Sequence, residues 1–581
     1  MLPARLVHNQ AGYDIYPTHN IGPDRITLGY SAIAAQLTPH RCLVVDGYAG
    51  ADWEQFRQQM TACWQRLGIT SAWFDVASAL RHQSERDTIV GRSLEGDDPL
   101  FGRACTASLE DFFDPAELAR LKPDNDASIS ILYGVGAELA GWAGTLVYVD
   151  LPKNEIQFRA RAGRATCIGE TAPASAKAAY RHNYFVDWPV LNRHKQRLLP
   201  GIDLLIDGQR GDEPTAISGD DLRLALDNLS HNLIRARPWF EPGAWGGHWM
   251  AEHLRQLPAD VPNYAWSFEL ISPENGIILE SSGVALEVTF DTLMFHDAAA
   301  VLGESASRFG VEFPIRFDFL DTFDGGNLSL QVHPRPSYIQ ENFGERFTQD
   351  ETYYILDAAP GSQVFLGFQA DINRDDFAGA LQDSAITGQP IDITRFVQEH
   401  PAHKHDLFLI PHGTIHASGV GNLVLEISST PYIFTFKLYD WVRPDLDGRP
   451  RPLNIARGLA NLDFDRRGET IAAEFISHPK LIATGDGWRL SHLPTHRDHF
   501  YDVHRIELDA GASYALHTND SVQVVSLVDG PQIDVQTGQQ TRQFCYAETF
   551  IVPAGANVAT FRAEAPVKLV IASIKPGRGP L

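Results

Sequence analysis

Cysteine and long apolar runs are both scarce in this chain. Five cysteines occur among 581 residues, without a Cys-x-x-Cys pair or a spacing typical of a disulfide framework, so we expect reduced, structural thiols. No stretch reaches the roughly 18 apolar residues that a membrane-spanning helix needs, and residues 1–17 lack the apolar core of a secretory signal. The sequence therefore predicts a cytoplasmic protein that has no membrane as a partner.

Positive charge is also in short supply. Lysine and arginine total 48 against 73 aspartate and glutamate residues, which gives a net charge of −25. Nucleic acids and anionic membrane surfaces attract basic proteins, so this balance argues against both as partners. A small anionic substrate remains compatible with it, because such a molecule needs only a local basic pocket.

The pattern of the first 232 residues is typical of an α/β domain. The apolar run "RCLVVDGYAG" (41–50) is closed by glycines, and "ADWEQFRQQMTACWQRLGI" (51–69) follows with apolar residues at helical intervals. The same succession of strand and turn returns in "SISILYGVGAELAGW" and "TLVYVDLP". Strands that alternate with helices predict a mostly parallel sheet covered by helices.

The loop after the first of these strands has the placement of a phosphate-binding loop but not its chemistry. A working P-loop has Gly-Lys-Ser/Thr before the helix, whereas Asp52 stands there and would repel phosphate. The domain looks like a degenerate P-loop kinase-like domain, with basic residues at a lid-like position after a later strand: Lys153, Arg159 and Arg161. A structural α/β domain with a solvated basic loop is the favoured alternative to nucleotide chemistry.

Residues 233–581 are dominated by short alternating strands. Runs such as "GIILESSGVALEVTF", "ETYYILDAAPGSQVFLGF" and "NLVLEISS", joined by Gly and Pro turns, predict an antiparallel sandwich or barrel with helical insertions over 233–465. Strands resume over 466–581, which is long enough for a second small β-barrel. We predict a multidomain protein of class α/β plus β, with three domains: 1–232, 233–465 and 466–581.

One strand of the second domain carries a file of polar side chains. In "NLSLQVHPRPSY" (327–338), Gln331 and His333 alternate with apolar residues and so share one face. Glu351 begins the next strand, and His416 follows a Pro and Gly turn. Imidazole, carboxylate and amide groups together suit zinc or another divalent ion. On the strand alone, a solvent-facing polar file is the stronger interpretation.

The order of the surrounding motifs resembles that of the type I phosphomannose isomerases, a family of the cupin superfamily. The matching pieces are "LSLQVHP" (328–334), "QDETYYILDAAPGSQVFLGF" (349–368), "LIPHGTIHASG" (409–419) and "FKLYDWVR" (436–443). Upstream, "PWFEPGAWGG" (238–247) is similar to the family's entry motif. The resemblance covers about residues 238–460 and implies that the two β domains are cupin-type barrels.

The resemblance also implies a function and a set of site residues. It implies one zinc ion and the interconversion of mannose 6-phosphate and fructose 6-phosphate by enediol proton transfer, so the expected partner is a sugar phosphate. The implied metal ligands are Gln331, His333, Glu351 and His416. The implied catalytic residues are Glu426 and Lys437, and Arg335 and Arg443 are candidates for substrate binding. The C-terminal barrel, 466–581, is expected to lack metal ligands.

Two positions depart from the family's pattern and leave alternatives open. Gln349 stands where a basic residue commonly precedes the metal-binding glutamate, and Lys437 stands where an arginine is usual. Lysine keeps the positive charge but loses the bidentate fork. The alternatives are an isomerase for a different sugar phosphate, a non-catalytic cupin that senses one, and a bifunctional protein with nucleotide chemistry at its N-terminus.

Overall fold

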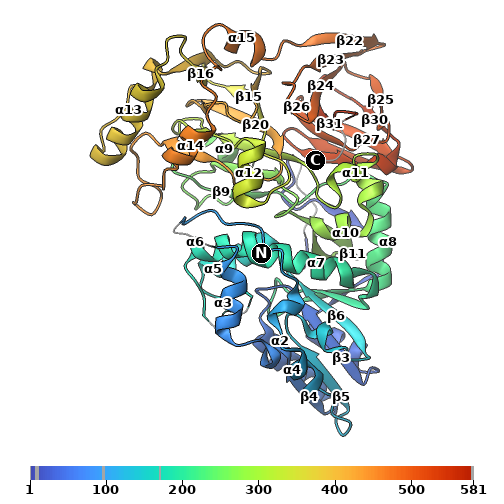
Figure 1. Ribbon diagram of the computed structural model, residues 1–581. Helices are drawn as coiled ribbons and strands as arrows, with labels where there is room; N and C mark the ends of the chain where they lie inside the picture. The colour runs from blue at the N-terminus through green and yellow to red at the C-terminus, as the bar shows by residue number, and fades with distance from the viewer. Residues whose placement is uncertain are drawn as a thin grey trace.

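The computed structural model describes residues 2–6, 12–94, 98–168, 170, 172–254 and 256–577. The ends of the first and last predicted domains, Met1 and Leu581, lie outside the described residues. The chain is a mixed α/β, sheet-rich, multidomain protein, as predicted. Figure 1 shows the N-terminal α/β layers in blue and cyan. The central segment, in green to orange, and the C-terminal sheets, in red, lie side by side above these layers.

The N-terminal segment is built on a seven-stranded sheet of order β2-β8-β7-β6-β3-β5-β4. Neighbouring strands pair in parallel from β4 to β7, β8 pairs antiparallel with β7, and β2 pairs antiparallel with β8. The bounds are β2 (Ile26–Leu28), β3 (Cys42–Gly47), β4 (Ser71–Asp75), β5 (Ile129–Tyr133), β6 (Thr145–Asp150), β7 (Leu204–Asp207) and β8 (Thr215–Ser218). The helices are α1 (Tyr30–Leu37), α2 (Trp53–Arg66), α3 (Gln83–Gly91), α4 (Pro115–Arg120), α5 (Lys153–Arg161), α6 (Ala176–His182), α7 (Trp188–Leu198) and α8 (Gly219–Ser230).

Strand β3 explains why helices cover both faces of this sheet. Val44 belongs to one apolar core, whereas its neighbours Leu43 and Val45 belong to another. Successive strand side chains point to opposite faces, so a continuous apolar run needs a cover on each side. The parallel α/β layer is therefore the predicted one.

The carboxyl end of β3 is fixed by a buried carboxylate. Asp46 is fully buried and accepts hydrogen bonds from the backbone N–H groups of Gly47, Gly136 and Glu138, at 2.7 to 3.0 Å. His194 Nε2 lies 2.9 Å from the same carboxylate. These contacts tie the end of β3 to the turn after β5 and to helix α7, and the relation of the following loop to kinase-like P-loops stays a prediction.

The central segment is a pair of antiparallel sheets. One has the order β18-β15-β20-β13-β10-β9 and the other β17-β16-β19-β14-β21. Tyr353 and Ile355 of the first sheet share an apolar core with Val364 and Leu366 of the second. The bounds in the first sheet are β18 (Leu407–Ile410), β15 (Glu351–Ala358), β20 (Asn422–Ser429), β13 (Ile315–Asp321), β10 (Trp266–Leu270) and β9 (Trp239–Glu241). In the second they are β17 (Val397–Pro401), β16 (Gln363–Phe368), β19 (His416–Ser418), β14 (Leu330–Val332) and β21 (Phe436–Tyr439).

Helices interrupt the central segment, as the sequence predicted. They are α9 (Trp249–His253), α10 (Phe290–Leu302), α11 (Ala306–Phe309), α12 (Pro336–Phe343), α13 (Arg374–Thr387), α14 (Ile455–Asn461) and α15 (Thr470–Glu474).

The C-terminal segment is a second antiparallel pair of sheets. Their orders are β22-β23-β24-β31-β26-β29 and β25-β30-β27-β28. Ile506 and Val525 of the larger sheet share one core with Ile533 and Phe561 of the smaller one. The bounds are β22 (Lys480–Gly485), β23 (Trp488–Leu493), β24 (Tyr501–Leu508), β31 (Val567–Ile574), β26 (Gln523–Asp529), β29 (Thr549–Val552), β25 (Ser513–His517), β30 (Val558–Arg562), β27 (Gln532–Thr537) and β28 (Gln540–Cys545).

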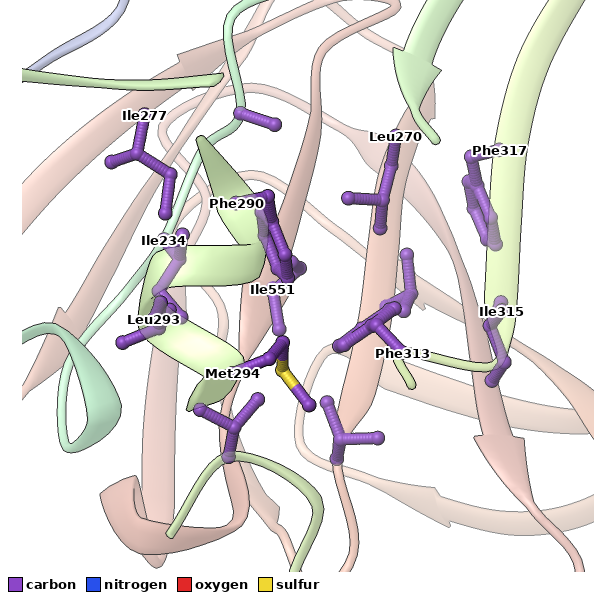
Figure 2. Packing of buried hydrophobic residues seen from close by; sticks show 14 of the residues in the cluster. Ile234, Leu270, Ile277, Phe290, Leu293, Met294, Phe313, Ile315, Phe317 and Ile551 are labelled. Carbon is purple, nitrogen blue, oxygen red and sulfur yellow. The ribbon is translucent and has the colours of Figure 1, made fainter. Parts of the chain in front are cut away.

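A single apolar cluster joins the three segments. Figure 2 shows Ile234, Phe290 and Leu293 packed together with Ile551 of β29. Ile234 also pairs with Ile551 through an isolated antiparallel bridge. In addition, the N-terminal strand β1 (Thr18–Asn20) pairs in parallel with β11 (Gly276–Ser281), which pairs antiparallel with β12 (Val284–Thr289). The same apolar packing therefore extends across the predicted domain boundaries, and the three-domain division stays a prediction.

Membrane-spanning elements were also sought. Among the described residues, no helix combines the length and the apolar character that crossing a bilayer requires.

Candidate metal centre and its cavity

Strand β14 presents its polar file to the space between the two central sheets. On its other face, Val332 lies against helix α14, where a Cβ atom added at Gly458 would come within 3.5 Å of Val332 Cγ1. Because strand side chains alternate, packing Val332 against that helix turns Gln331 and His333 the opposite way. Both are buried, His333 completely, which rules out the solvent-facing interpretation.

Strand register places further polar groups beside Gln331. Gln331 is paired with His416 of β19 on one side and with Lys437 of β21 on the other. Residues directly opposite each other in an antiparallel pair have Cβ atoms about 4.5 to 5.5 Å apart on the same face. The sheet therefore carries Lys437, Gln331 and His416 in one row.

The facing sheet carries the acidic groups. Glu351 begins β15 and is paired with Ser428 of β20, and Glu426 is two residues earlier on the same strand β20. Glu426 is also paired with Asp318 of β13. The alternation in β20 puts Glu426 and Ser428 on one face, so the carboxylates of Glu351 and Glu426 share the interior with the row on the other sheet.

Three ligand-type side chains converge at the centre. The carboxylate of Glu351 lies 2.9 Å from His333 Nε2 and 3.2 Å from His416 Nε2. The Gln331 amide nitrogen lies 3.2 Å from His416 Nε2. The structure therefore brings all four predicted ligands together, and the ligand atoms of His333, Glu351 and His416 lie within 4.8 Å of one another.

Backbone contacts fix the orientation of both imidazoles. His333 Nδ1 lies 3.1 Å from the Phe434 carbonyl, and His416 Nδ1 lies 2.9 Å from the Thr414 carbonyl. A carbonyl only accepts hydrogen bonds, so each Nδ1 donates and each Nε2 keeps its lone pair. This second shell is typical of metal-binding histidines.

The electrostatics of the cluster fit a bound cation. His333 Nε2 and Glu351 Oε2 are buried and have no hydrogen-bond partner among the described residues. Burial favours the neutral form of His416 and lowers its pKa. Burial alone would raise the pKa of Glu351, but the two histidines hold that pKa well below its usual value. The imidazole nitrogens and the carboxylate oxygens point at one another at 2.9 and 3.2 Å, so that a proton or a metal cation lies between them, and the N/O donor set suits a divalent cation.

A buried arginine that sequence reasoning missed connects the acidic groups. Arg316 of β13 forms ion pairs with Glu426 and with Asp318, the latter at 3.2 Å, and its Nε donates to Ser428 Oγ at 2.8 Å. Burial raises the pKa of Asp318 to about 7. The signal in the sequence is the alternation in "IRFDFLD" (315–321), where Arg and Asp replace apolar residues on one face of a strand.

Lys437 lies on the edge of this polar interior. It is half-buried, and the described residues offer its ammonium group no ion-pair partner. Burial, together with the positive charge of Arg451, lowers the pKa of Lys437 to about 8. Lys437 is therefore a cation that loses its charge more readily than an ordinary lysine.

Other predicted or flagged residues lie elsewhere or act indirectly. Arg335 is exposed and donates to the backbone carbonyls of Asn461 and Leu462, at 3.0 and 2.8 Å. Arg443 pairs with Asp440 at 2.7 Å and donates to the Asn327 carbonyl. The structure does not bring these two arginines to the lining of the cavity.

Gln349 does lie at the centre. Its amide nitrogen donates to Glu351 Oε1 at 2.7 Å. Gln349 therefore orients a candidate metal ligand and adds no charge to the site.

A cavity of about 620 Å³ opens onto this cluster. Its lining includes Gln331, Glu351, Glu426 and Lys437 from the central sheets. Residues of the N-terminal helices α5 and α6 complete the lining on another side: Gln157, Ala160, Arg161, Ala176, Lys177 and Tyr180. A cavity of this size is in the range of small-molecule sites.

A second group of metal-ligand type lies in the N-terminal segment. Cys167, His182 and Asp187 are buried, and their ligand atoms lie within 4.8 Å of one another. His182 Nδ1 is 2.9 Å from Asp187 Oδ1, and Asp187 also accepts the backbone N–H of Ile168. Burial opposes the charge of His182, but Asp187 outweighs burial and raises its pKa. His182 and Asp187 therefore form a buried ion pair, while His182 Nε2 has no hydrogen-bond partner among the described residues.

Two different groups of known sequences match this chain. A family model described as "Domain of unknown function (DUF8485)" matches residues 29–231. The mannose-6-phosphate isomerase of Streptococcus mutans serotype c is 28% identical over 216 residues, which are 37% of this chain and 63% of that protein. The mannose-6-phosphate isomerase of Bacillus subtilis is 27% identical over 223 residues, 38% of this chain and 65% of that protein.

A solved structure was also compared with the chain. The crystal structure of the mannose 6-phosphate isomerase from Bacillus subtilis aligns with a TM-score of 0.47 and 18% identity, over 58% of this chain and 99% of that chain.

The sequence relatives and the chain overlap only in part. The chain spans 63 to 65% of the length of these two curated relatives. Somewhat less than two fifths of the chain is therefore homologous to mannose-6-phosphate isomerases, and a separate family of undescribed function accounts for most of the first 231 residues.

Proposed function

We propose that this chain is a metal-dependent aldose–ketose isomerase that interconverts mannose 6-phosphate and fructose 6-phosphate. The observation that carries the proposal is the convergence of His333, Glu351 and His416 on one point, with unpartnered buried ligand atoms, at the wall of a cavity. The names of the relatives support the same reaction class. The proposed ligands are Gln331, His333, Glu351 and His416.

Zinc is the metal we propose. Two imidazole nitrogens, a carboxylate and an amide oxygen form a mixed N/O set, which suits zinc better than the all-oxygen sites of magnesium or calcium. The reaction moves a carbonyl from C1 to C2, which requires loss of a proton that is weakly acidic until the charge on the enediolate oxygen is stabilised. A divalent cation at this site would supply that stabilisation as a Lewis acid.

The chain's own residues move and balance the proton. We assign the base to Glu426, whose carboxylate forms an ion pair with Arg316 and accepts a hydrogen bond from Ser428 Oγ at 2.9 Å. Glu426 takes the proton from one carbon and returns it to the other. Lys437 adds positive charge beside the reacting oxygens, and the half-buried setting strengthens that interaction.

A coupled assay tests the proposed reaction. Purified protein loaded with zinc is expected to form fructose 6-phosphate from mannose 6-phosphate, and a chelator is expected to abolish the activity. No turnover by folded, zinc-loaded protein would rule the proposed reaction out. A panel of other aldose phosphates belongs in the same assay, because the neutral Gln349 lines the cavity and favours a related substrate as the second candidate.

Metal content tests the ligands independently of activity. His333→Ala and His416→Ala are each expected to lower bound zinc from one equivalent per chain by at least about tenfold at limiting metal, because each removes one of the few protein ligands. His517→Ala is the control, since His517 is exposed on β25. Equal zinc in all three variants, measured by elemental analysis, would place the metal elsewhere.

A further inference from the structure

The N-terminal helices form one side of the proposed active site. Gln157 and Arg161 on α5 and Lys177 and Tyr180 on α6 line the same cavity as Glu351. All four residues lie within residues 29–231, which the family model without a described function matches.

Contacts across the junction hold this wall in place. Arg161 forms an ion pair with Glu241 of β9 at 2.5 Å. Glu274 accepts hydrogen bonds from Gln157, at 2.5 Å, and from the Tyr180 hydroxyl, at 3.1 Å. Tyr432, which precedes β21, donates to the same Glu274 carboxylate and lies 3.1 Å from the Tyr180 hydroxyl. Helices α5 and α6 are therefore held against the central sheets by these contacts.

Two cations of the cavity lining lack an anionic partner. Arg161, Arg316 and Arg451 each form ion pairs with carboxylates. In the part of the chain that the structure describes, neither Lys177 nor Lys437 has an ion-pair partner. Both lysines line the same cavity as Glu351 and Glu426. Two like charges that face one cavity without a counterion favour the binding of an anion between them.

Two carboxylates, Asp440 and Asp445, act on the charge of Lys437. Asp440 is bound by Arg443 and by both donors of Arg451, at 2.6 to 2.7 Å. Asp445, which also lines the cavity, accepts the backbone N–H of Leu446 at 2.9 Å. Asp440 is therefore occupied by two arginines, and Lys177 and Lys437 remain the cations of the lining that have no ion-pair partner among the described residues.

We propose that Lys177 of the N-terminal segment binds the phosphate group of the substrate, so that the active site is completed only by the union of the two halves of the chain. This inference rests on the proposed function for the identity of the substrate, and on the cavity for the identity of the residue. In this proposal the sugar carbons bind beside Glu351 and Glu426 and the dianionic phosphate beside Lys177, since these residues line one cavity. The N-terminal segment thus supplies specificity for phosphorylated sugars.

Lys177→Ala tests the role in binding. Loss of a charged hydrogen bond to phosphate is expected to raise KM for the sugar phosphate about tenfold and to affect kcat much less, because the phosphate is remote from the reacting carbons. Zinc content is expected to stay at one equivalent, and Lys177→Arg is expected to recover most of the affinity. Lys122→Ala, an exposed lysine of the same segment, is the matched control.

A binding measurement separates this inference from the proposed reaction. Calorimetric titration with inorganic phosphate, on zinc-loaded wild-type protein and both alanine variants, is expected to show weaker binding only for Lys177→Ala. If wild-type protein binds phosphate through Lys177 but does not isomerise, the proposed reaction fails and the role of Lys177 stands. If wild-type protein isomerises and Lys177→Ala keeps its KM and its phosphate affinity, the role of Lys177 is wrong.

Discussion

At the scale of single residues, the site depends on which atoms are left without partners. In both His333 and His416, Nδ1 donates a hydrogen bond to a backbone carbonyl, and Nε2 faces the interior. Glu426 forms an ion pair with Arg316 in the same interior. Under the proposed function, one set of groups binds the ion and Glu426 moves the proton.

Glu426→Gln separates these two roles. The amide keeps the shape of the side chain but cannot take a proton, so kcat is expected to fall by about 10²- to 10⁴-fold. Zinc content is expected to equal that of the wild type, because Glu426 is not a proposed ligand. A variant with wild-type kcat, or one with full loss of zinc, would contradict the assignment of the base.

Glu274 gives the junction between the two halves a pH dependence. Burial raises the pKa of Glu274 from its usual 4.5 to about 7. The folded protein therefore holds this proton more tightly than the unfolded chain, so stability due to this group falls as pH rises from about 4.5 to about 7 and is level above that range.

Glu274→Gln removes that dependence. Between pH 5 and pH 7, the stability of the wild type relative to this variant is expected to fall by at least about 1 kcal/mol, given 1.36 kcal/mol per pKa unit. Denaturant unfolding at the two pH values measures it. Parallel pH profiles for the two proteins would show that Glu274 is ionised throughout.

Several of these residues were visible in the sequence and others were not. The alternation around Gln331 and His333 fixes which residues share a face, since strand side chains have a period of two. It does not say which face is buried, because that depends on helix α14, which lies more than a hundred residues further along the chain. Arg335 and Arg443 are next to the motifs in sequence, but their side chains contact backbone carbonyls and Asp440 instead of the cavity.

At the scale of elements, helix α14 sets the position of β14 and β21. A Cβ atom at Gly458 would lie 2.5 Å from Leu438 Cδ2, so the helix can approach these strands only where it has no side chain. Because β14 carries Gln331 and β21 carries Lys437, the same contact positions one row of the site. The packing of α14 on the outer face of β14 and β21 therefore controls where Gln331 and Lys437 lie on the inner face.

Gly458→Val is expected to displace that row. Overpacking at a close contact costs about 1 to 3 kcal/mol, so the free energy of unfolding is expected to fall and zinc affinity to fall with it. Gly379→Ala is the control, because Gly379 lies in helix α13 and a Cβ atom there meets nothing within 4 Å. A helical Gly→Ala change without a clash is expected to be neutral or stabilising. Equal zinc affinity in both variants would show that α14 does not position the site.

At the scale of the whole molecule, the two halves of the chain share an interior. The α/β layer, the central sheets and the C-terminal sheets meet in one apolar cluster, and the cavity is lined from both sides of the junction. The sequence predicted the α/β and β-rich segments because each has its own periodicity. It did not predict that Lys177 reaches the cavity, because that contact follows from how separate segments pack against one another and has no local pattern.

The central claim is that one metal ion at His333, Glu351 and His416 makes this chain an isomerase. A zinc titration of metal-free protein, followed by formation of fructose 6-phosphate from mannose 6-phosphate, tests it most directly. Activity is predicted to rise from zero to a plateau at one equivalent of zinc per chain in the wild type, and to stay near zero in His333→Ala over the same range. Activity in the metal-free protein, or an equal rise in His333→Ala, would contradict the claim.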